Sequence, residues 1–153
     1  MSLTVAELRQ RIATLLGSIE GWRESPFPFE LFPLDPGRFA HHAFAVGVGR
    51  SSFTTPVESS RHRGGGSRLE TGGLGDTVVA VRWLARLRAD ASVADLDIAL
   101  ADELELVEAL VGITTTDMHL ALETLDRRTV GDGTWLLGEL GLTAQHRYPL
   151  QRA

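Results

Sequence analysis

The stretch from residue 76 to residue 88 alternates between apolar and charged side chains, and this alternation limits what the chain can fold into. Val79 and Trp83 fall on one side of an extended backbone, whereas Arg82 and Arg86 fall on the other. Successive side chains of a strand point to opposite faces, so the pattern requires a sheet with one buried face. We therefore expect the other elements of the chain to cover that face.

Three further segments are predicted to join this sheet. Residues 42–53 alternate apolar and small side chains, which is typical of a strand. Residues 115–130 fit either a helix or a strand, and we favour a strand because Thr114, Thr115 and Thr116 prefer extended backbone. A Gly-Asp-Gly turn then leads to a final strand, whose inward side is formed by Leu136, Leu140, Leu142, Ala144 and Tyr148.

Two amphipathic helices are predicted. Thr4 and Glu7 form a capping box at the start of the first helix, which we expect to end near Gly21 and Trp22. The second helix starts near Ser92 and ends at Gly112. Its expected buried stripe, spaced by three and four residues, is Val93, Leu96, Leu100, Leu104, Val107 and Val111.

These elements predict one α+β domain over residues 1–153. The order is helix, strand, strand, helix, strand, strand, and the simplest packing places both helices on one face of a four-stranded, mostly antiparallel sheet. A Gly- and Arg-rich arm, residues 54–75, separates the first two strands. A structureless segment this long is unusual inside a compact domain.

The arm and the second helix carry opposite charges. The arm is either a hairpin tip without a role or a segment that orders when Arg61, Arg63 and Arg68 meet an acidic surface. The second helix has six acidic residues within fourteen positions, and Asp102, Glu105 and Glu108 are among them. They form either a solvated face or a functional acidic surface, which would receive a neighbour's arm or repel nucleic acid.

A segment rich in Pro and Phe, residues 23–41, precedes the first long strand. Phe27, Phe29 and Phe32 are too apolar to remain in water, whereas the four Pro residues oppose regular strand pairing. The segment is therefore either an ordered loop over the domain's own core or a docking surface for another subunit.

Catalytic, cofactor and metal chemistry are not expected. The chain has no Cys, which excludes disulfides and thiolate sites, and it has no Lys for a phosphate-binding loop. His41 and His42 point to opposite faces of a strand, and Ser59, Ser60 and His62 lie in the arm, where geometry is not fixed.

The net charge of −5 disfavours tight nucleic-acid binding. With neither a signal peptide nor an apolar run of about 18 residues, we expect neither export nor a membrane.

The arrangement resembles the tail terminator proteins of long-tailed bacteriophages and of gene transfer agents. The resemblance rests on the helix ending near Trp22, the strand at residues 44–48 before the long arm, the strand at 78–87 followed by the helix at 96–111, and the closing run from Thr134 to Leu150. It covers most of the chain, but the segment 26–39 has no counterpart in the family pattern.

This resemblance implies a structural role in a virion assembled in the host cytoplasm. Subunits would form a hexameric ring that caps the tail tube, ends its polymerisation and joins the tail to the head-side connector, while DNA passes through without specific binding. Two alternatives stay open: another neck or head-completion protein, and a bacterial ligand-binding or regulatory α+β module that uses the groove beside the Phe-rich segment.

Overall fold

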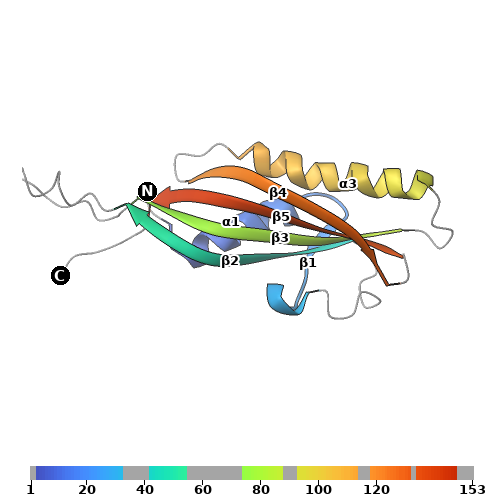
Figure 1. The fold of residues 1–153 in the computed structure, drawn as a ribbon, viewed down its shortest axis with the longest axis horizontal. Helices are drawn as coiled ribbons and strands as arrows, with labels where there is room; N and C mark the ends of the chain where they lie inside the picture. Colours follow the sequence, from blue (N-terminus) through green and yellow to red (C-terminus); the bar gives the residue numbers. More distant parts are fainter. Residues whose placement is uncertain are drawn as a thin grey trace, which may run out of the picture.

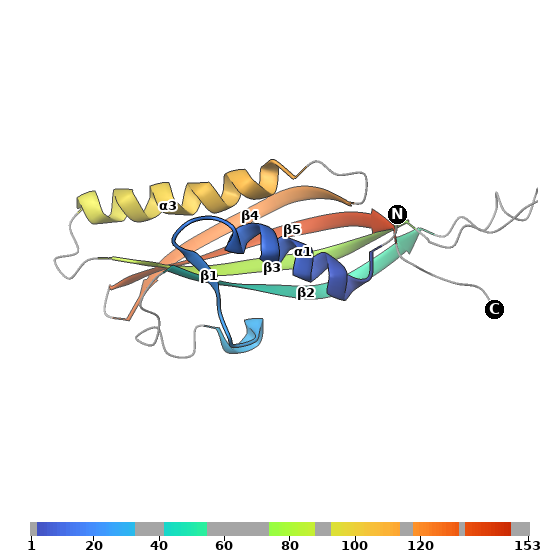
Figure 2. The same cartoon turned by 180° about the vertical axis from the view of Figure 1, so that it is seen from behind.

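The protein is an α+β domain in which a five-stranded sheet carries both helices on one face (Figures 1 and 2). The computed structural model describes residues 3–32, 42–54, 74–87, 93–113, 118–131 and 134–147. The strands follow the order β1-β2-β3-β5-β4 across the sheet. The elements are α1 (Val5–Gly17), β1 (Trp22–Glu24), the 3₁₀ turn η1 (Phe29–Leu31), β2 (His42–Thr54), β3 (Leu74–Arg86), α3 (Val93–Val111), β4 (Met118–Val130) and β5 (Trp135–Arg147).

The α+β class is confirmed, but the expected count of four strands was wrong. The fifth strand, β1, pairs parallel with the start of β2, so the sheet is mixed rather than only antiparallel. The first helix was also predicted too long: it ends at Gly17, and Gly21 adopts a φ of 90° in the turn that follows. Glycine favours this left-handed backbone, which redirects the chain so that Trp22 begins a strand. The sequence did not predict β1, because a strand of three residues is too short to show an alternating pattern.

The capping box at the start of α1 is confirmed. The Glu7 backbone N–H donates to Thr4 Oγ1 at 3.0 Å, and the Thr4 backbone N–H donates to Glu7 Oε1 at 3.1 Å. The two bonds satisfy N–H groups that a helix start leaves without partners. The bond from the Thr4 backbone also holds the pKa of Glu7 below its usual value.

The main core lies between the helices and the sheet. The predicted inward face of β3 is confirmed, because Val79, Val81 and Trp83 are all fully buried. Trp83 pairs across the sheet with Gly138, where a Cβ atom would overlap the indole ring. Only glycine at this position leaves room for the ring.

The ambiguous segment after α3 is a strand, as predicted. β4 pairs antiparallel with β5 along its whole length, with a register shift between Leu122 and Thr124. β4 is the outermost strand on its side of the sheet, and β5 alone pairs with it among the described residues.

A buried hydrogen-bonded chain ties the N-terminal segment to the far end of the sheet. His146 Nδ1 lies 3.1 Å from the Leu3 carbonyl oxygen, which can only accept, so Nδ1 carries the proton. His146 Nε2 therefore accepts from Thr77 Oγ1 at 2.8 Å, and Ser51 Oγ lies 2.9 Å from the same hydroxyl. These hydrogen bonds join β2, β3 and β5 to Leu3, which precedes the N-cap residue of α1.

Replacing Gly138 tests the packing of the core. Gly138→Ala should lower the free energy of unfolding by roughly 1–3 kcal/mol, because the new methyl group overlaps the buried Trp83 ring. Gly49→Ala is the matched control, since its Cβ would meet its nearest neighbour, Val78, at 3.7 Å. Urea unfolding measures both; equal stability of the two variants would contradict the packing.

The buried histidine predicts a pH dependence of stability. Burial lowers the pKa of His146 from the ordinary value of 6.5, so the unfolded chain takes up this proton at a higher pH than the folded chain does. The stabilising contribution of the neutral ring is complete above pH 6.5 and is lost as the pH falls towards the folded value. His146→Gln should be less stable at pH 7 by about 1–3 kcal/mol. The deficit should shrink between pH 7 and 5 in urea unfolding, whereas a constant deficit would contradict the assignment.

Candidate subunit interface

α3 meets the sheet with a different side from the one its apolar spacing predicts. The residues of α3 that are buried are Asp95, Ala99, Glu103, Leu106 and Leu110, each one position before a member of the predicted stripe. One position corresponds to about 100° of rotation around a helix. The predicted buried stripe was therefore wrong. Its members Val93, Leu96, Leu104 and Val111 are exposed, whereas Leu100 and Val107 are half-buried and Leu100 packs against the edge of the main core.

A buried carboxylate accounts for this rotation. Glu103 is 2% exposed, and its two oxygens accept from the Trp83 indole N–H at 3.1 Å and from Arg127 Nε at 2.6 Å. A buried charge is tolerated when it is paired and hydrogen-bonded in this way. From the sequence, Glu103 was predicted to be one of the solvent-exposed acids of this helix. Its partners lie on β3 and β4, and no local spacing in the sequence reveals them.

The outward rotation leaves an apolar stripe in contact with solvent. Val93 is 77% exposed, Leu104 53% and Val111 64%, while Leu100 and Val107 are half-buried. Scattered exposed apolar residues are ordinary, but a contiguous stripe of them marks a contact surface. We name the α3 stripe as the residues Val93, Leu96, Leu100, Leu104, Val107 and Val111.

The α3 stripe borders a groove at the edge of the sheet. The groove has a volume of about 410 Å³ and is lined by Leu100, Leu104 and Val107 of α3 and by Leu125 and Arg127 of β4, with Glu103 at its floor. In both views of the fold, α3 runs alongside β4, the outermost strand (Figures 1 and 2). An apolar helix side and the outermost strand of the described sheet thus lie next to each other.

The acidic residues predicted as an interface have different surroundings. Asp102 is half-buried and lies 2.8 Å from His42 Nε2, so it is engaged within the protomer. Glu105 and Glu108 are exposed on α3. The three arginines assigned to the arm, Arg61, Arg63 and Arg68, lie outside the described residues.

The predicted Phe residues lie on the opposite face of the sheet from α3. Phe32 is buried in a second cluster with Ala43, Ala45, Leu84, Trp135 and Leu137, and Phe27 and Phe29 pack against that cluster half-buried. The part of the segment that the structure describes therefore covers the protein's own sheet, which is the first of the two interpretations given above. The structure does not bring these residues together with the acidic side of α3.

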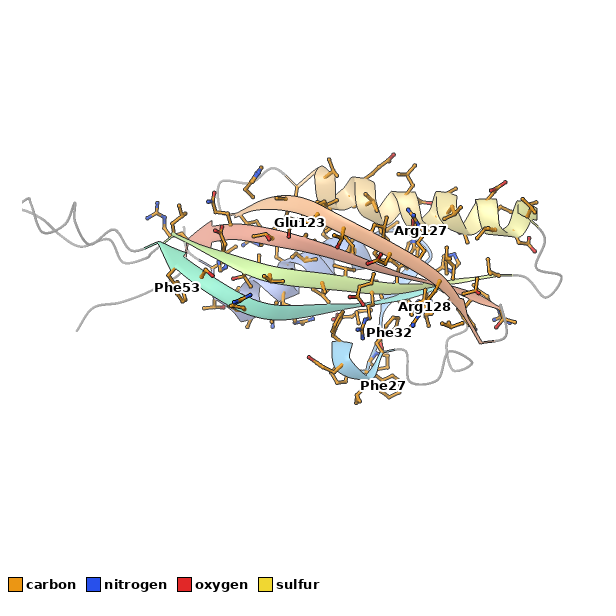
Figure 3. The ribbon with its side chains drawn as sticks, in the orientation of Figure 1. Phe27, Phe32, Phe53, Glu123, Arg127 and Arg128 are labelled. Atoms are coloured by element: carbon orange, nitrogen blue, oxygen red, sulfur yellow. The ribbon has the colours of Figure 1, made fainter. Side chains whose placement is uncertain are left out.

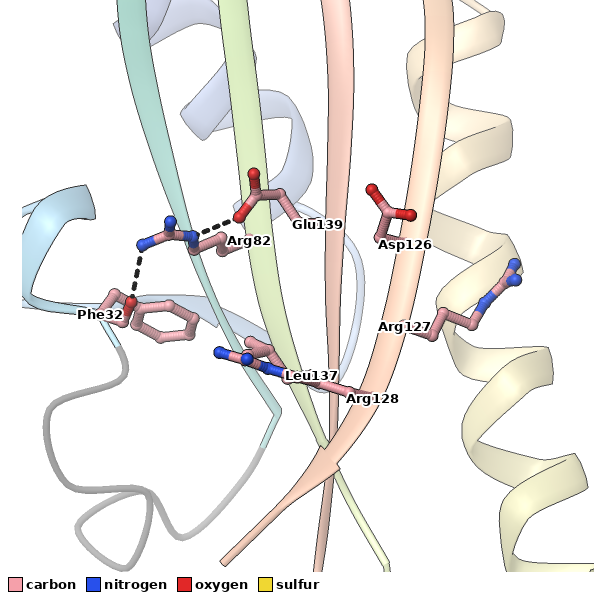
Figure 4. Close-up of a pocket in the computed structure, with 7 residues that line it drawn as sticks. All are labelled: Phe32, Arg82, Asp126, Arg127, Arg128, Leu137 and Glu139. Atoms are coloured by element: carbon pink, nitrogen blue, oxygen red, sulfur yellow. Dashed lines mark hydrogen bonds and ion pairs between the residues drawn. The ribbon is translucent and has the colours of Figure 1, made fainter.

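Arg82 fastens the Phe segment to the sheet. Its guanidinium group stacks 4.2 Å from the Phe29 ring centroid and donates to the backbone carbonyls of Phe29 and Phe32, each at 3.2 Å. It also donates to Glu139 at 2.6 Å (Figure 4). A shallow hollow of about 340 Å³ lies beside this network, and Arg128 borders it, whereas Arg127 points towards α3 (Figure 4).

Within the described ranges, no group of three or more His, Asp or Glu residues is arranged to hold a metal ion. None of the helices described is both long and apolar enough to cross a membrane.

No protein-family model matches the chain, and no curated protein matches it in sequence. Among solved structures, the chain is similar to a chain from the virion of a native gene transfer agent particle. The two chains are 18% identical, with a TM-score of 0.43, over 89% of this chain and 84% of the other.

Proposed function

We propose that the protein is a structural virion protein of the head–tail junction that acts as a tail terminator. Copies of the chain assemble into a hexameric ring that caps the tail tube, stops its polymerisation and contacts the head-side connector. The observation that supports this proposal is the α3 stripe, most of which the described protomer leaves exposed beside the outermost strand, β4. Such a surface needs a partner to remove it from water.

A ring requires that one surface of each copy meets a different surface of the next copy. The α3 stripe lies at one edge of the sheet, and the exposed part of β2 lies at the other edge. Contacts between two different edges repeat from copy to copy around an axis. The ring closes when the rotation between neighbouring copies divides a full turn evenly. The role is therefore assembly, and we assign no catalytic step to the chain.

The charge of the protein suits a passage for DNA. The net charge is −5, and exposed carboxylates such as Glu105 and Glu108 repel phosphate groups. Tight DNA binding depends on clustered cations that release counterions from the phosphates. A ring built from this chain would let DNA pass without holding it.

The ring is tested by measuring the mass of the purified full chain in solution and imaging the same sample by electron microscopy. We expect a mass of six protomers and six-fold rings. Adding the rings to growing tubes of the tube protein from the same particle should shorten the tubes. Rings that leave tube length unchanged would favour another neck protein, and a monomer at all concentrations would overturn both roles.

The arm provides a second prediction. Replacing Arg61, Arg63 and Arg68 together with Ser should shift the assembly towards monomer. Three ion pairs at roughly 0.2–1 kcal/mol each correspond to about a threefold to hundredfold weaker contact. Light scattering across a concentration series measures the shift.

The double variant Glu105→Gln and Glu108→Gln is the reciprocal change. If the arm binds the acidic side of α3, combining both sets of substitutions should weaken assembly no more than either set alone. Additive effects would show that the two sets of charges do not meet, and an unchanged mass in all variants would reject a role for the arm.

A further inference from the structure

The turn η1 ends in an exposed apolar side chain at the edge of the sheet opposite β4. Leu31, its last residue, is 48% exposed, and Glu30 beside it is exposed as well. In Figure 1 this light-blue turn extends beyond β2, whereas α3 runs along the β4 side. Figure 3 shows the same separation, with Phe27 and Phe32 on the β2 side and Arg127 on the β4 side. The Phe segment covers the protein's own sheet but leaves this leucine in contact with solvent.

The turn that carries Leu31 is held in a fixed position. The Phe32 backbone N–H donates to the Phe29 carbonyl at 3.1 Å, and Arg82 donates to the carbonyls of both residues at 3.2 Å. The Phe29 ring lies on the backbone of Gly47, where any Cβ atom would overlap it. A group that is already fixed loses little conformational entropy when it binds a partner. Leu31 is therefore well placed to serve as an anchor.

The α3 stripe is poorly suited to meet a second α3 stripe. α3 contains six acidic residues and no basic residue, and Asp97, Glu105 and Glu108 are exposed on it. Two copies that met through their stripes would bring these carboxylates close together, and such like-charge contacts are unfavourable. The stripe and the groove beside it therefore call for a different surface of the neighbouring copy.

We propose that Leu31 of a second copy of this chain inserts into the groove between α3 and β4. The groove holds about 410 Å³, and its apolar walls are formed by Leu100, Leu104, Val107 and Leu125. The turn and the groove lie at opposite edges of one sheet, so a neighbour displaced across the strands brings the two together (Figure 1). Each copy then uses η1 towards one neighbour and the groove towards the other, as a ring requires. This inference rests on the proposed ring, for which it names the subunit contact.

A charged pair accompanies the apolar contact. Arg127 borders the groove and uses its Nε atom to bind Glu103, but its side chain is 43% exposed and its guanidinium group carries further N–H donors. Glu30, next to Leu31 in η1, supplies an exposed carboxylate for these donors. Hydrogen bonds between a guanidinium group and a carboxylate are stronger than those between neutral groups.

The other charges near the groove point elsewhere. Asp126 and Arg128 flank Arg127 along β4, so they point to the other face of the sheet, where they pair across β5 with Glu139 and Leu137. Figure 4 shows Arg128 directed away from α3.

The exposed acids of α3 lie beyond the groove. Glu105 and Glu108 each follow a groove residue by one position, which places them about 100° further round the helix than Leu104 and Val107. The apolar stripe therefore separates their carboxylates from Arg127.

The absence of Cys from the chain makes a direct test available. Leu31→Cys is combined with Leu104→Cys in one chain. η1 packs against β2, which lies three strand spacings or about 14 Å from β4, whereas a disulfide joins Cα atoms no more than roughly 7 Å apart. A disulfide between these two positions can therefore form only between copies. Leu31→Cys with Ile98→Cys is the matched control, because Ile98 is 49% exposed against 53% for Leu104 and lies about 120° away around α3.

We expect the Leu31→Cys and Leu104→Cys pair to give a ladder of cross-linked oligomers that ends at the closed ring on non-reducing gels. The control pair should give no ladder. Cross-linking no stronger than in the control would overturn the contact. Dimers formed by the Leu104→Cys variant alone would also overturn it, because they would show one α3 against another.

Alanine variants test the same contact without cross-linking. Leu31→Ala and Leu104→Ala should each weaken the contact between copies by roughly three- to tenfold, since each leucine is about half exposed in the protomer. Ile98→Ala should have no effect. Because the two leucines meet, the double variant should lose less than the product of the single effects, as measured by light scattering across a concentration series. A full product would place the two side chains in separate contacts and overturn the pairing.

The wild-type chain separates failure of the contact from failure of the ring. If it forms rings and the Leu31→Cys and Leu104→Cys pair gives no ladder above the control, the proposed function stands and the Leu31 contact fails. If it stays monomeric at all concentrations, the proposed function fails and the contact fails with it.

Discussion

The carboxylate of Glu103 fixes the surface that the protein presents. It accepts from the Trp83 indole in the centre of the sheet and from Arg127 on the outermost strand, and these two bonds set the rotation of α3. A lone carboxylate in this position would be strongly unfavourable, so the bonds and the rotation are maintained together. Because Glu103 points inward, Leu104, one position later, points towards solvent, and its neighbours Leu100 and Val107 stay half-buried. The exposed apolar surface is thus a consequence of a polar interaction in the core.

This arrangement divides the molecule into surfaces with different roles. The helix face of the sheet is buried by α1 and α3, and the other face is partly covered by Phe32 and its neighbours. Among the described residues, β4 is the outermost strand on the side of α3, and β1 and β2 lie at the other edge of the sheet. Contact between two unlike edges of neighbouring copies is the head-to-tail assembly that the proposed ring requires.

Local patterns in the sequence predicted most of the elements. The alternation around Val79 and Trp83 identified β3 and its buried face, and Thr4 with Glu7 identified the start of α1. Periodicity did not predict the rotation of α3, because two stripes one residue apart are both largely apolar and the choice depends on partners of Glu103 that are distant in sequence. The short strand β1 was missed for lack of length, and the Phe residues could not be assigned to either face without knowing where Arg82 lies.

Hydrogen exchange tests the central claim most directly, because it reports on the backbone amides of each strand separately. The full chain is compared at a dilution where it is monomeric and at a concentration where it is assembled. The account predicts that amides in β4, the outermost strand beside the α3 stripe, become protected on assembly, while those in the centre of β3 change little. Assembly without added protection in β4 would contradict it, and would place the contact between copies elsewhere on the molecule.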